Sequence, residues 1–184
     1  VATLKRVVEQ EGGCIVWGGK ARLSPADDVL IRIERPLDMD SSGQLVASVL
    51  SKKAAAGVSH VLVDLPVGPT AKIRTVAEAQ RLSDRLREVG DAVGLQVLPV
   101  LTDGTQPVGY GIGPALEAWD VLRVLQGDAE GPAELRERGL LLAGLLLELA
   151  GKASAGAGQA MAREILADGR AWQRNVTQLH GSRA

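Results

Sequence analysis

The sequence predicts an α/β fold in which a mostly parallel sheet is flanked by helices. Two apolar runs, VSHVLVDLPV at 58–67 and LQVLPVL at 95–101, are predicted to be strands, and the first contains β-branched residues and has the pattern of a strand covered on both faces. A helical pattern over 75–89 separates them. Strands that alternate with helices are joined by crossover connections, so we expect these two to run parallel in one sheet.

The remaining elements follow from local patterns. Before the first of these strands, we expect a helix over 2–11 that is ended by a pair of glycines, a short buried strand CIVW at 14–17, and a helix over 41–56. The prolines in SPADDVLIRIERPLDMD interrupt its alternation, so this segment is predicted to be a connection. After the second strand, three helices are expected, and the last of them ends near residue 168: 113–126, 132–150 and 154–168.

Composition excludes several classes of function. The 21 basic residues are balanced by 22 acidic ones, so no net positive field is present to hold nucleic acid or an anionic membrane. The single cysteine cannot form an internal disulfide, and two distant histidines are poor material for a zinc site. The stretch GLLLAGLLLELAG is too short for a membrane span and contains Glu148. We expect a cytoplasmic protein that binds no nucleic acid, membrane, metal or cofactor.

Two glycine-rich loops follow the strands, at the edge of the sheet where parallel folds bind ligands. Neither DLPVGPTAK nor GYGIG has the glycine spacing of a Walker or Rossmann phosphate loop. Asp64 and Asp103 are expected at strand ends, where a catalytic carboxylate and a loop cap are equal alternatives. Gly113 with Pro114 opens a helix whose N–H groups could hold an anion or could simply start the helix.

Ser48 and Lys52 are spaced i, i+4 on the helix predicted over 41–56. Both side chains therefore lie on one face, one turn apart. Together they could donate to a flat acceptor such as a nucleobase carbonyl. On the residues alone, ordinary solvent-facing polar side chains are the better explanation, and Lys53 beside them strengthens it.

From Gly13 to about Arg170 the chain resembles the thymidine phosphorylase family. The matching stretches are GGCIVWGG, SPADD, DSSGQLVASVLSKKAAAG, VLVDLPVGPTAK, LTDGTQPVGYGIGPALEA and GPAELRERGLLLAGLLLELAG. IVWGG, VGPTAK and GIGPALEA are most similar to the branch of AMP phosphorylases and proteins named putative thymidine phosphorylase. In the family's reaction phosphate attacks C1 of a nucleoside sugar, the base departs, and a sugar 1-phosphate forms.

The resemblance assigns the base-binding residues. A serine and a lysine one helical turn apart, with an arginine upstream, hold the pyrimidine in the family; these become Ser48, Lys52 and Arg35. Arg32 is a possible substitute for Arg35, because the spacing of ERPLDMD differs from the family pattern by about two residues. Arg35 and Lys52 are the expected catalytic pair, since donors aimed at the departing base stabilise the charge that develops on it. Phosphate is the co-substrate.

Two alternatives stay open. AMP phosphorylases release adenine from a nucleotide, and Lys72 or Arg74 could then bind the 5'-phosphate. A second alternative, from another class, is a non-catalytic scaffold or assembly module that keeps the fold without the chemistry.

The family has a helical lobe and a larger α/β lobe, and it forms dimers. By this resemblance the chain is an incomplete catalytic domain: 1–22 begin the α/β domain, 23–56 carry the base-binding helix of the helical lobe, 57–174 continue the α/β domain, and 175–184 are an atypical tail. A loop like KxSTGGxGD, which holds phosphate in the family, has no equivalent in this sequence, and Tyr110 stands where relatives commonly have arginine. We therefore expect a portion of a longer chain or a truncated product that is inactive alone.

Overall fold

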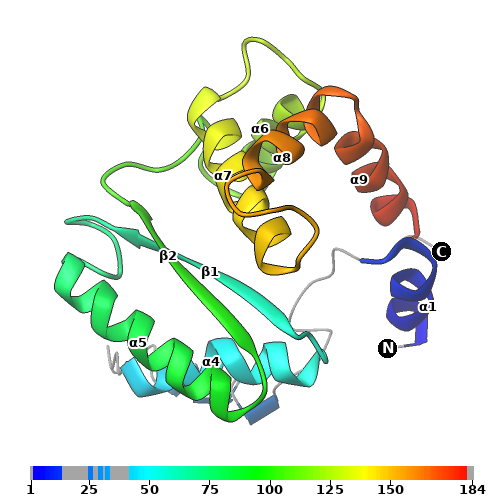
Figure 1. Cartoon of the computed structure of the whole chain (residues 1–184). Coiled ribbons are helices and arrows are strands. Elements are labelled where there is room, and N and C mark those ends of the chain that lie inside the picture. The colour runs from blue at the N-terminus through cyan, green and yellow to red at the C-terminus, as the bar shows by residue number, and fades with distance from the viewer. Residues whose placement is uncertain (1, 14–24, 27–28, 31, 34–41, 182–184) are drawn as a thin grey trace. The chain divides into compact units, whose positions relative to one another are not determined.

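The computed structural model describes residues 2–13, 25–26, 29–30, 32–33 and 42–181 (Figure 1). The strand expected at 14–17 lies outside the described residues. The chain divides into two compact units, of which one spans residues 22–106 and the other combines residues 1–21 with residues 107–184. The domain boundaries inferred from the family remain predictions.

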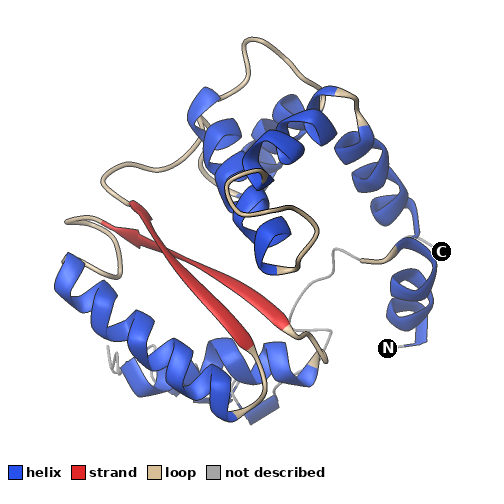
Figure 2. Cartoon of the chain, viewed as in Figure 1, coloured by secondary structure: helices blue, strands red, loops and turns tan. Residues whose placement is uncertain are grey.

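The unit of residues 22–106 is a parallel α/β arrangement, as the sequence predicts. Its described elements are α4 (Ser42–Ala55), β1 (His60–Val67), α5 (Val76–Ala92) and β2 (Gln96–Asp103). The two strands pair in parallel along their whole length, from His60 opposite Gln96 to Val67 opposite Asp103 (Figure 2). The helix α5 is the crossover between them, so one complete βαβ unit is present.

The core of this unit joins both helices to one face of the sheet. Val61 and Leu65 alternate along β1 and are 5% and 3% exposed. They form one buried cluster with apolar side chains of α4, α5 and the start of β2, namely Val46, Leu50, Leu82, Leu86 and Leu95. Leu62 and Leu98, on the opposite face of the sheet, are only half-buried. The sequence predicts burial of both faces, whereas this core covers one of them.

Local signals end α4 and start α5 where the sequence places them. Gly57 has φ of 72°, which favours glycine, and its N–H donates to the carbonyl of Ala54 at 3.0 Å. Thr75 caps α5 through a reciprocal capping box with Glu78. These two signals fix the length of the connections on either side of β1.

The second unit is helical in its described residues. It contains α1 (Ala2–Glu11), α6 (Pro114–Leu125), α7 (Ala133–Leu149), α8 (Gly158–Ala167) and α9 (Arg170–Gly181). The first four of these helices confirm the helices that the sequence predicts over 2–11, 113–126, 132–150 and 154–168. Over the part of the chain that the structure describes, no helix combines the length and the apolar character needed to cross a bilayer.

The helix α9 is not expected from the sequence, where the last helix ends near residue 168 and 175–184 are a tail. It packs against α1, α6 and α8. Trp172, Val176 and Leu179 recur at i, i+4 and i+7, which is a helical spacing. This signal is weak because polar residues dominate the segment, and packing against its neighbours supplies the missing stabilisation. At the other end, the described residues between 25 and 33 have helical backbone where a connection is expected.

The helices α7 and α8 cross with their backbones in direct contact. A Cβ added at Gly144 of α7 would lie 2.5 Å from the backbone nitrogen of Gln159 in α8. Gly158 N donates to Glu148 Oε1 at 2.8 Å beside the same crossing. The absence of a side chain at Gly144 therefore sets the distance between these helices.

Gly144→Ala is expected to lower the free energy of unfolding by about 1–3 kcal/mol, because the added methyl group forces the helices apart. Gly139→Ala is the matched control on α7, since nothing lies within 4 Å of its added Cβ. It is expected to stabilise the helix by up to about 1 kcal/mol. Urea unfolding followed by circular dichroism measures both variants, and equal effects would contradict the assignment of Gly144 as the contact residue.

Candidate functional site

Ser48 and Lys52 lie together on one face of α4, as their spacing predicts. The Lys52 ammonium donates to Ser48 Oγ at 3.1 Å, and both side chains are half-buried. Val46 and Leu50 are buried in the core, and the partly buried Leu45 and Val49 lie between them and the face of Ser48 and Lys52. Core packing therefore fixes the rotation of α4 and places the Ser48–Lys52 pair at the border of the buried stripe.

The arginine expected to complete this group is less well placed. Arg35 lies outside the described residues. Arg32 is described, and its side chain is exposed on a helical piece of backbone. The structure thus brings Ser48 and Lys52 together, and the position of either arginine relative to them stays a prediction.

The carboxylates near the strand ends take structural roles. Asp64 is inside β1, three residues before its end, and not at the end as expected. Its Oδ1 accepts a 2.6 Å hydrogen bond from Thr102 Oγ1 of β2. Asp103 is the last residue of β2, and its carboxylate accepts from the backbone N–H of Thr105 at 2.9 Å. Both contacts favour a role in holding the strands and the loop.

The loops that follow the two strands touch backbone to backbone. Gly104 N donates to the carbonyl of Val67 at 2.9 Å, so the pairing of the strands continues into the loops. A Cβ added at Gly68 would overlap the backbone of Gly104, and a Cβ at Gly104 would press on Pro66. Glycine is therefore required at these two positions by close approach.

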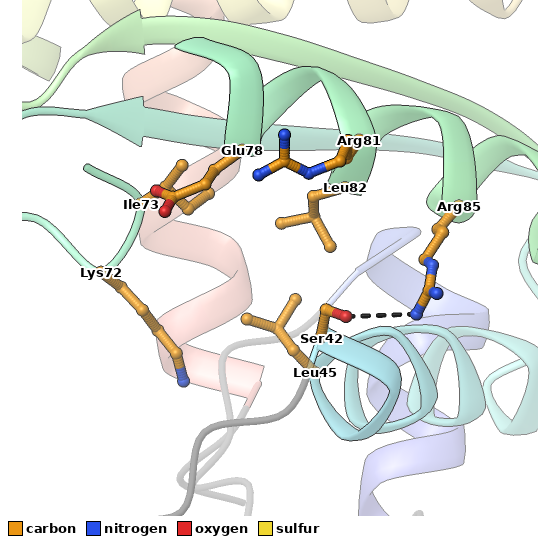
Figure 3. A pocket seen from close by; sticks show the side chains of 8 residues that line it. All are labelled: Ser42, Leu45, Lys72, Ile73, Glu78, Arg81, Leu82 and Arg85. Carbon is orange, nitrogen blue, oxygen red and sulfur yellow. Dashed lines mark hydrogen bonds between the residues drawn. The ribbon is translucent and has the colours of Figure 1, made fainter. Parts of the chain in front are cut away.

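A pocket of about 370 Å³ opens between α4, the loop after β1 and α5 (Figure 3). Three cationic side chains contribute to it: Lys72 from the loop, with Arg81 and Arg85 from α5. Apolar side chains and two polar ones complete the lining: Leu45, Ile73, Leu82, Ser42 and Glu78. Ser48 and Lys52 of α4 do not line it, and neither does Arg74, which the sequence offers as an alternative to Lys72.

Among the residues that the structure describes, cations outnumber carboxylates in the lining of this pocket. Glu78 is the one carboxylate among them. Backbone hydrogen bonds from Arg74 and Thr75 hold the pKa of Glu78 below its usual value, so this carboxylate is ionised at neutral pH and used by the capping box. Arg85 donates to Ser42 Oγ at 3.2 Å and so ties α5 to the first turn of α4. Lys72, Arg81 and Arg85 outnumber Glu78, whose carboxylate already accepts backbone hydrogen bonds, and this balance of charge suits an anionic ligand.

Sequence reasoning offers Lys72 or Arg74 for a 5'-phosphate, of which Lys72 lines this pocket, and it misses Arg81 and Arg85. Their i, i+4 spacing on α5 places them on one face and is the signal that could have found them.

The glycine-rich loop before α6 is folded around the protein's own carboxylates. Asp120, which is 4% exposed, accepts hydrogen bonds from Tyr110 N at 2.6 Å and Gly111 N at 2.8 Å. At the start of α6, Glu117 accepts from Gly113 N at 3.0 Å. Of the two explanations for this segment, the plain helix start is therefore the better supported, because the carboxylate of Glu117 already lies at the start of the helix and holds the N–H of the N-cap Gly113.

Comparison with known proteins finds relatives of high sequence identity. Over 172 residues, or 94% of this chain, it is 67% identical to "Putative thymidine phosphorylase 1" of Acidovorax sp. (strain JS42). Over 174 residues it is 62% identical to "Putative thymidine phosphorylase" of Polaromonas sp., and over 171 residues 57% identical to the protein of that name from Legionella pneumophila (strain Corby). These identities support assignment of the chain to the thymidine phosphorylase family.

The match covers only part of these relatives. The chain spans about a third of their length, 34% for the Acidovorax and Polaromonas proteins and 33% for the Legionella protein. No family profile matches the chain. The family assignment therefore rests on these pairwise identities, which are high over almost the whole of the chain.

Asp120→Ala is expected to lower the free energy of unfolding by about 2–4 kcal/mol, because two backbone N–H groups lose their acceptor in a buried place. Glu117→Ala, which removes an exposed carboxylate from the same helix, is expected to cost less than about 1 kcal/mol. Thermal or urea unfolding of the two variants measures the difference, and a smaller loss for Asp120→Ala than for Glu117→Ala would refute the loop-holding role.

Proposed function

We propose that this chain is part of a nucleoside phosphorylase that cleaves thymidine or a related pyrimidine nucleoside with phosphate. The products are the free base and the sugar 1-phosphate. The Ser48–Lys52 pair carries this proposal: the two side chains are hydrogen-bonded and half-buried on one face of α4, in a chain 67% identical to a relative named putative thymidine phosphorylase.

The pair suits the charge that develops in this reaction. When phosphate attacks C1 of the sugar, the glycosidic bond breaks and its electron pair moves onto the base. Lys52 donates to Ser48 Oγ, which makes that oxygen an acceptor and turns the hydroxyl proton of Ser48 away from Lys52. The hydroxyl proton and the ammonium charge then act on the oxygens of the departing base. Their stabilisation grows as the charge grows, so it lowers the barrier more than it strengthens substrate binding.

Arg35 is proposed to add a second cation to the base, with Arg32 as the alternative. Both belong to the segment that precedes α4 in the sequence. A guanidinium offers several N–H donors in one plane and can bind a carbonyl edge of a flat ring.

A phosphorylated substrate is a second candidate, and the cationic pocket favours it. Lys72, Arg81 and Arg85 surround a space large enough for a phosphate group and part of a sugar. An AMP phosphorylase would place the 5'-phosphate of its nucleotide among such cations and would release adenine with ribose 1,5-bisphosphate. The two candidates differ in substrate but share the same bond cleavage.

Lys52→Ala is expected to lower the rate of phosphate-dependent base release by about a hundredfold or more, because one donor to the developing charge is lost. The assay uses the Acidovorax relative with this chain's residues placed over the matched 172 residues, so that the whole site is present. Lys53→Ala, which removes an exposed neighbouring ammonium, is the control and should leave the rate unchanged.

An unchanged rate for Lys52→Ala would remove this residue from the reaction. If the chimera folds but cleaves neither nucleosides nor nucleotides, the scaffold explanation is supported instead.

Lys72→Ala distinguishes the two substrates. If AMP is cleaved, the KM for AMP is expected to rise by about 10- to 100-fold, as for loss of one charge-assisted hydrogen bond. The KM for thymidine and uridine should not change, because neither carries a phosphate. Arg87→Ala is the control on α5, since Arg87 pairs with Asp84 and does not line the pocket. Activity on thymidine alone, without AMP cleavage, would exclude the nucleotide candidate.

A further inference from the structure

Two arginines of the cationic pocket differ from other arginines of this chain in how their charge is balanced. Five arginines outside the pocket pair with a carboxylate: Arg87 with Asp84, Arg123 with Asp128, Arg138 with Glu134, Arg163 with Glu137, and Arg170 with Asp168. Over the described part of the chain, neither Arg81 nor Arg85 forms such a pair. These two like charges also lie one helical turn apart on α5, a spacing that destabilises a helix. An anion bound to both would offset this repulsion.

Glu78 does not supply the anion. Its Oε2 accepts hydrogen bonds from the backbone N–H groups of Arg74 at 3.1 Å and Thr75 at 3.2 Å. These hydrogen bonds are the main cause of the lowered pKa of Glu78, whereas the charge of Arg81 contributes least to it. The carboxylate is therefore used at the start of α5, and the two arginines remain available to a ligand.

The donors of the pocket suit a phosphate group. Arg85 reaches across to α4 and donates to Ser42 Oγ at 3.2 Å (Figure 3). A hydroxyl that accepts one hydrogen bond can still donate its own proton, so Ser42 offers a further donor beside the two guanidinium groups. Guanidinium groups bind phosphate oxygens through two parallel N–H groups. All lining residues belong to the unit of residues 22–106, so this group of donors is built within one compact unit.

The rest of the lining indicates that the ligand also has an uncharged part. Leu45 of α4, Ile73 of the loop after β1 and Leu82 of α5 provide apolar surface in the same pocket. The volume of about 370 Å³ exceeds what a phosphate group alone would fill. Apolar surface with a few placed polar groups is typical of sites for small organic ligands.

We infer that Arg81 and Arg85 bind the phosphate group of a phosphate monoester, with Ser42 as a further donor. The organic part of the ligand lies on Leu45, Ile73 and Leu82, and the bound ligand joins α5 to the first turn of α4. Leu45 precedes Ser48 by one helical turn, so a ligand that fixes this turn also fixes the Ser48–Lys52 pair. The inference goes beyond the reaction proposed above, because binding requires no catalysis and any monoester of suitable size can occupy the site.

The test measures binding of ribose 5-phosphate to this chain by isothermal titration, with ribose as the matched probe that carries no phosphate. Arg81→Ala and Arg85→Ala are each expected to weaken binding of ribose 5-phosphate by about 10- to 100-fold, as for loss of one charge-assisted hydrogen bond. Arg87→Ala is the matched control, since it removes an exposed arginine of α5 that pairs with Asp84 and does not line the pocket. Its affinity should equal that of the unmodified chain.

Hydrogen exchange provides a second readout, because ribose 5-phosphate should slow exchange of the amides in α4 and ribose should not. Circular dichroism verifies folding, and if the isolated chain is unfolded the same titrations are made on the chimera of the activity assay. Absence of binding, equal binding of ribose, or equal losses for all three arginine variants would overturn the inference. The last result would mean attraction by overall charge alone.

The chimera also distinguishes the source of the phosphate. If the phosphate belongs to the substrate, ribose 5-phosphate competes with AMP for cleavage. If it belongs to a separate ligand, ribose 5-phosphate changes the rate of thymidine cleavage without competing with thymidine. Both results support a monoester site. A chimera that binds ribose 5-phosphate through Arg81 and Arg85 but cleaves nothing would reject the proposed reaction and support the site.

Discussion

Packing of α4 on the sheet and on α5 determines the chemistry available in the unit of residues 22–106. Val46 and Leu50 of α4 are buried against Val61 and Leu65 of β1 and against the apolar face of α5. Since a helix turns 100° per residue, the partly buried Leu45 and Val49 lie beside these positions, and Ser48 and Lys52 follow them at the border of the core. Partial burial strengthens the field of the Lys52 ammonium compared with a fully solvated one. A different rotation of α4 would bury the ammonium or expose it completely.

The elements that depend on local patterns could be predicted from the sequence. The strands β1 and β2 are apolar runs that contain valines, and α5 carries both a capping residue and an apolar stripe. The Ser48–Lys52 contact also follows from i, i+4 spacing alone. The helix α9 could not be predicted in this way, because its stability comes from neighbouring helices and not from its own composition. The sequence does not reveal the pocket for a similar reason: Arg81 and Arg85 line the same pocket as Lys72 only after α5 has folded onto the sheet.

Carboxylates show what sequence position alone leaves open. For Asp64 and Asp103, position after an apolar run is equally compatible with a catalytic group and with a loop cap. In the structure each has a specific donor, Thr102 and the backbone of Thr105, and holds the sheet or the loop. Asp120, which no motif distinguishes, is the most buried carboxylate of the described residues and organises the loop before α6. Hydrogen-bond donors that meet a carboxylate through tertiary structure are not visible in sequence.

The contact between Gly68 and Gly104 links the loops that follow β1 and β2 mechanically. With no side chain between them and a hydrogen bond from Gly104 to Val67, neither backbone can be displaced far without the other. A molecule that pushes on the loop bearing Lys72 therefore also shifts the turn beyond Asp103. The ends of β1 and β2 therefore move together. A molecule bound beside one strand would displace the end of the other through these backbone contacts.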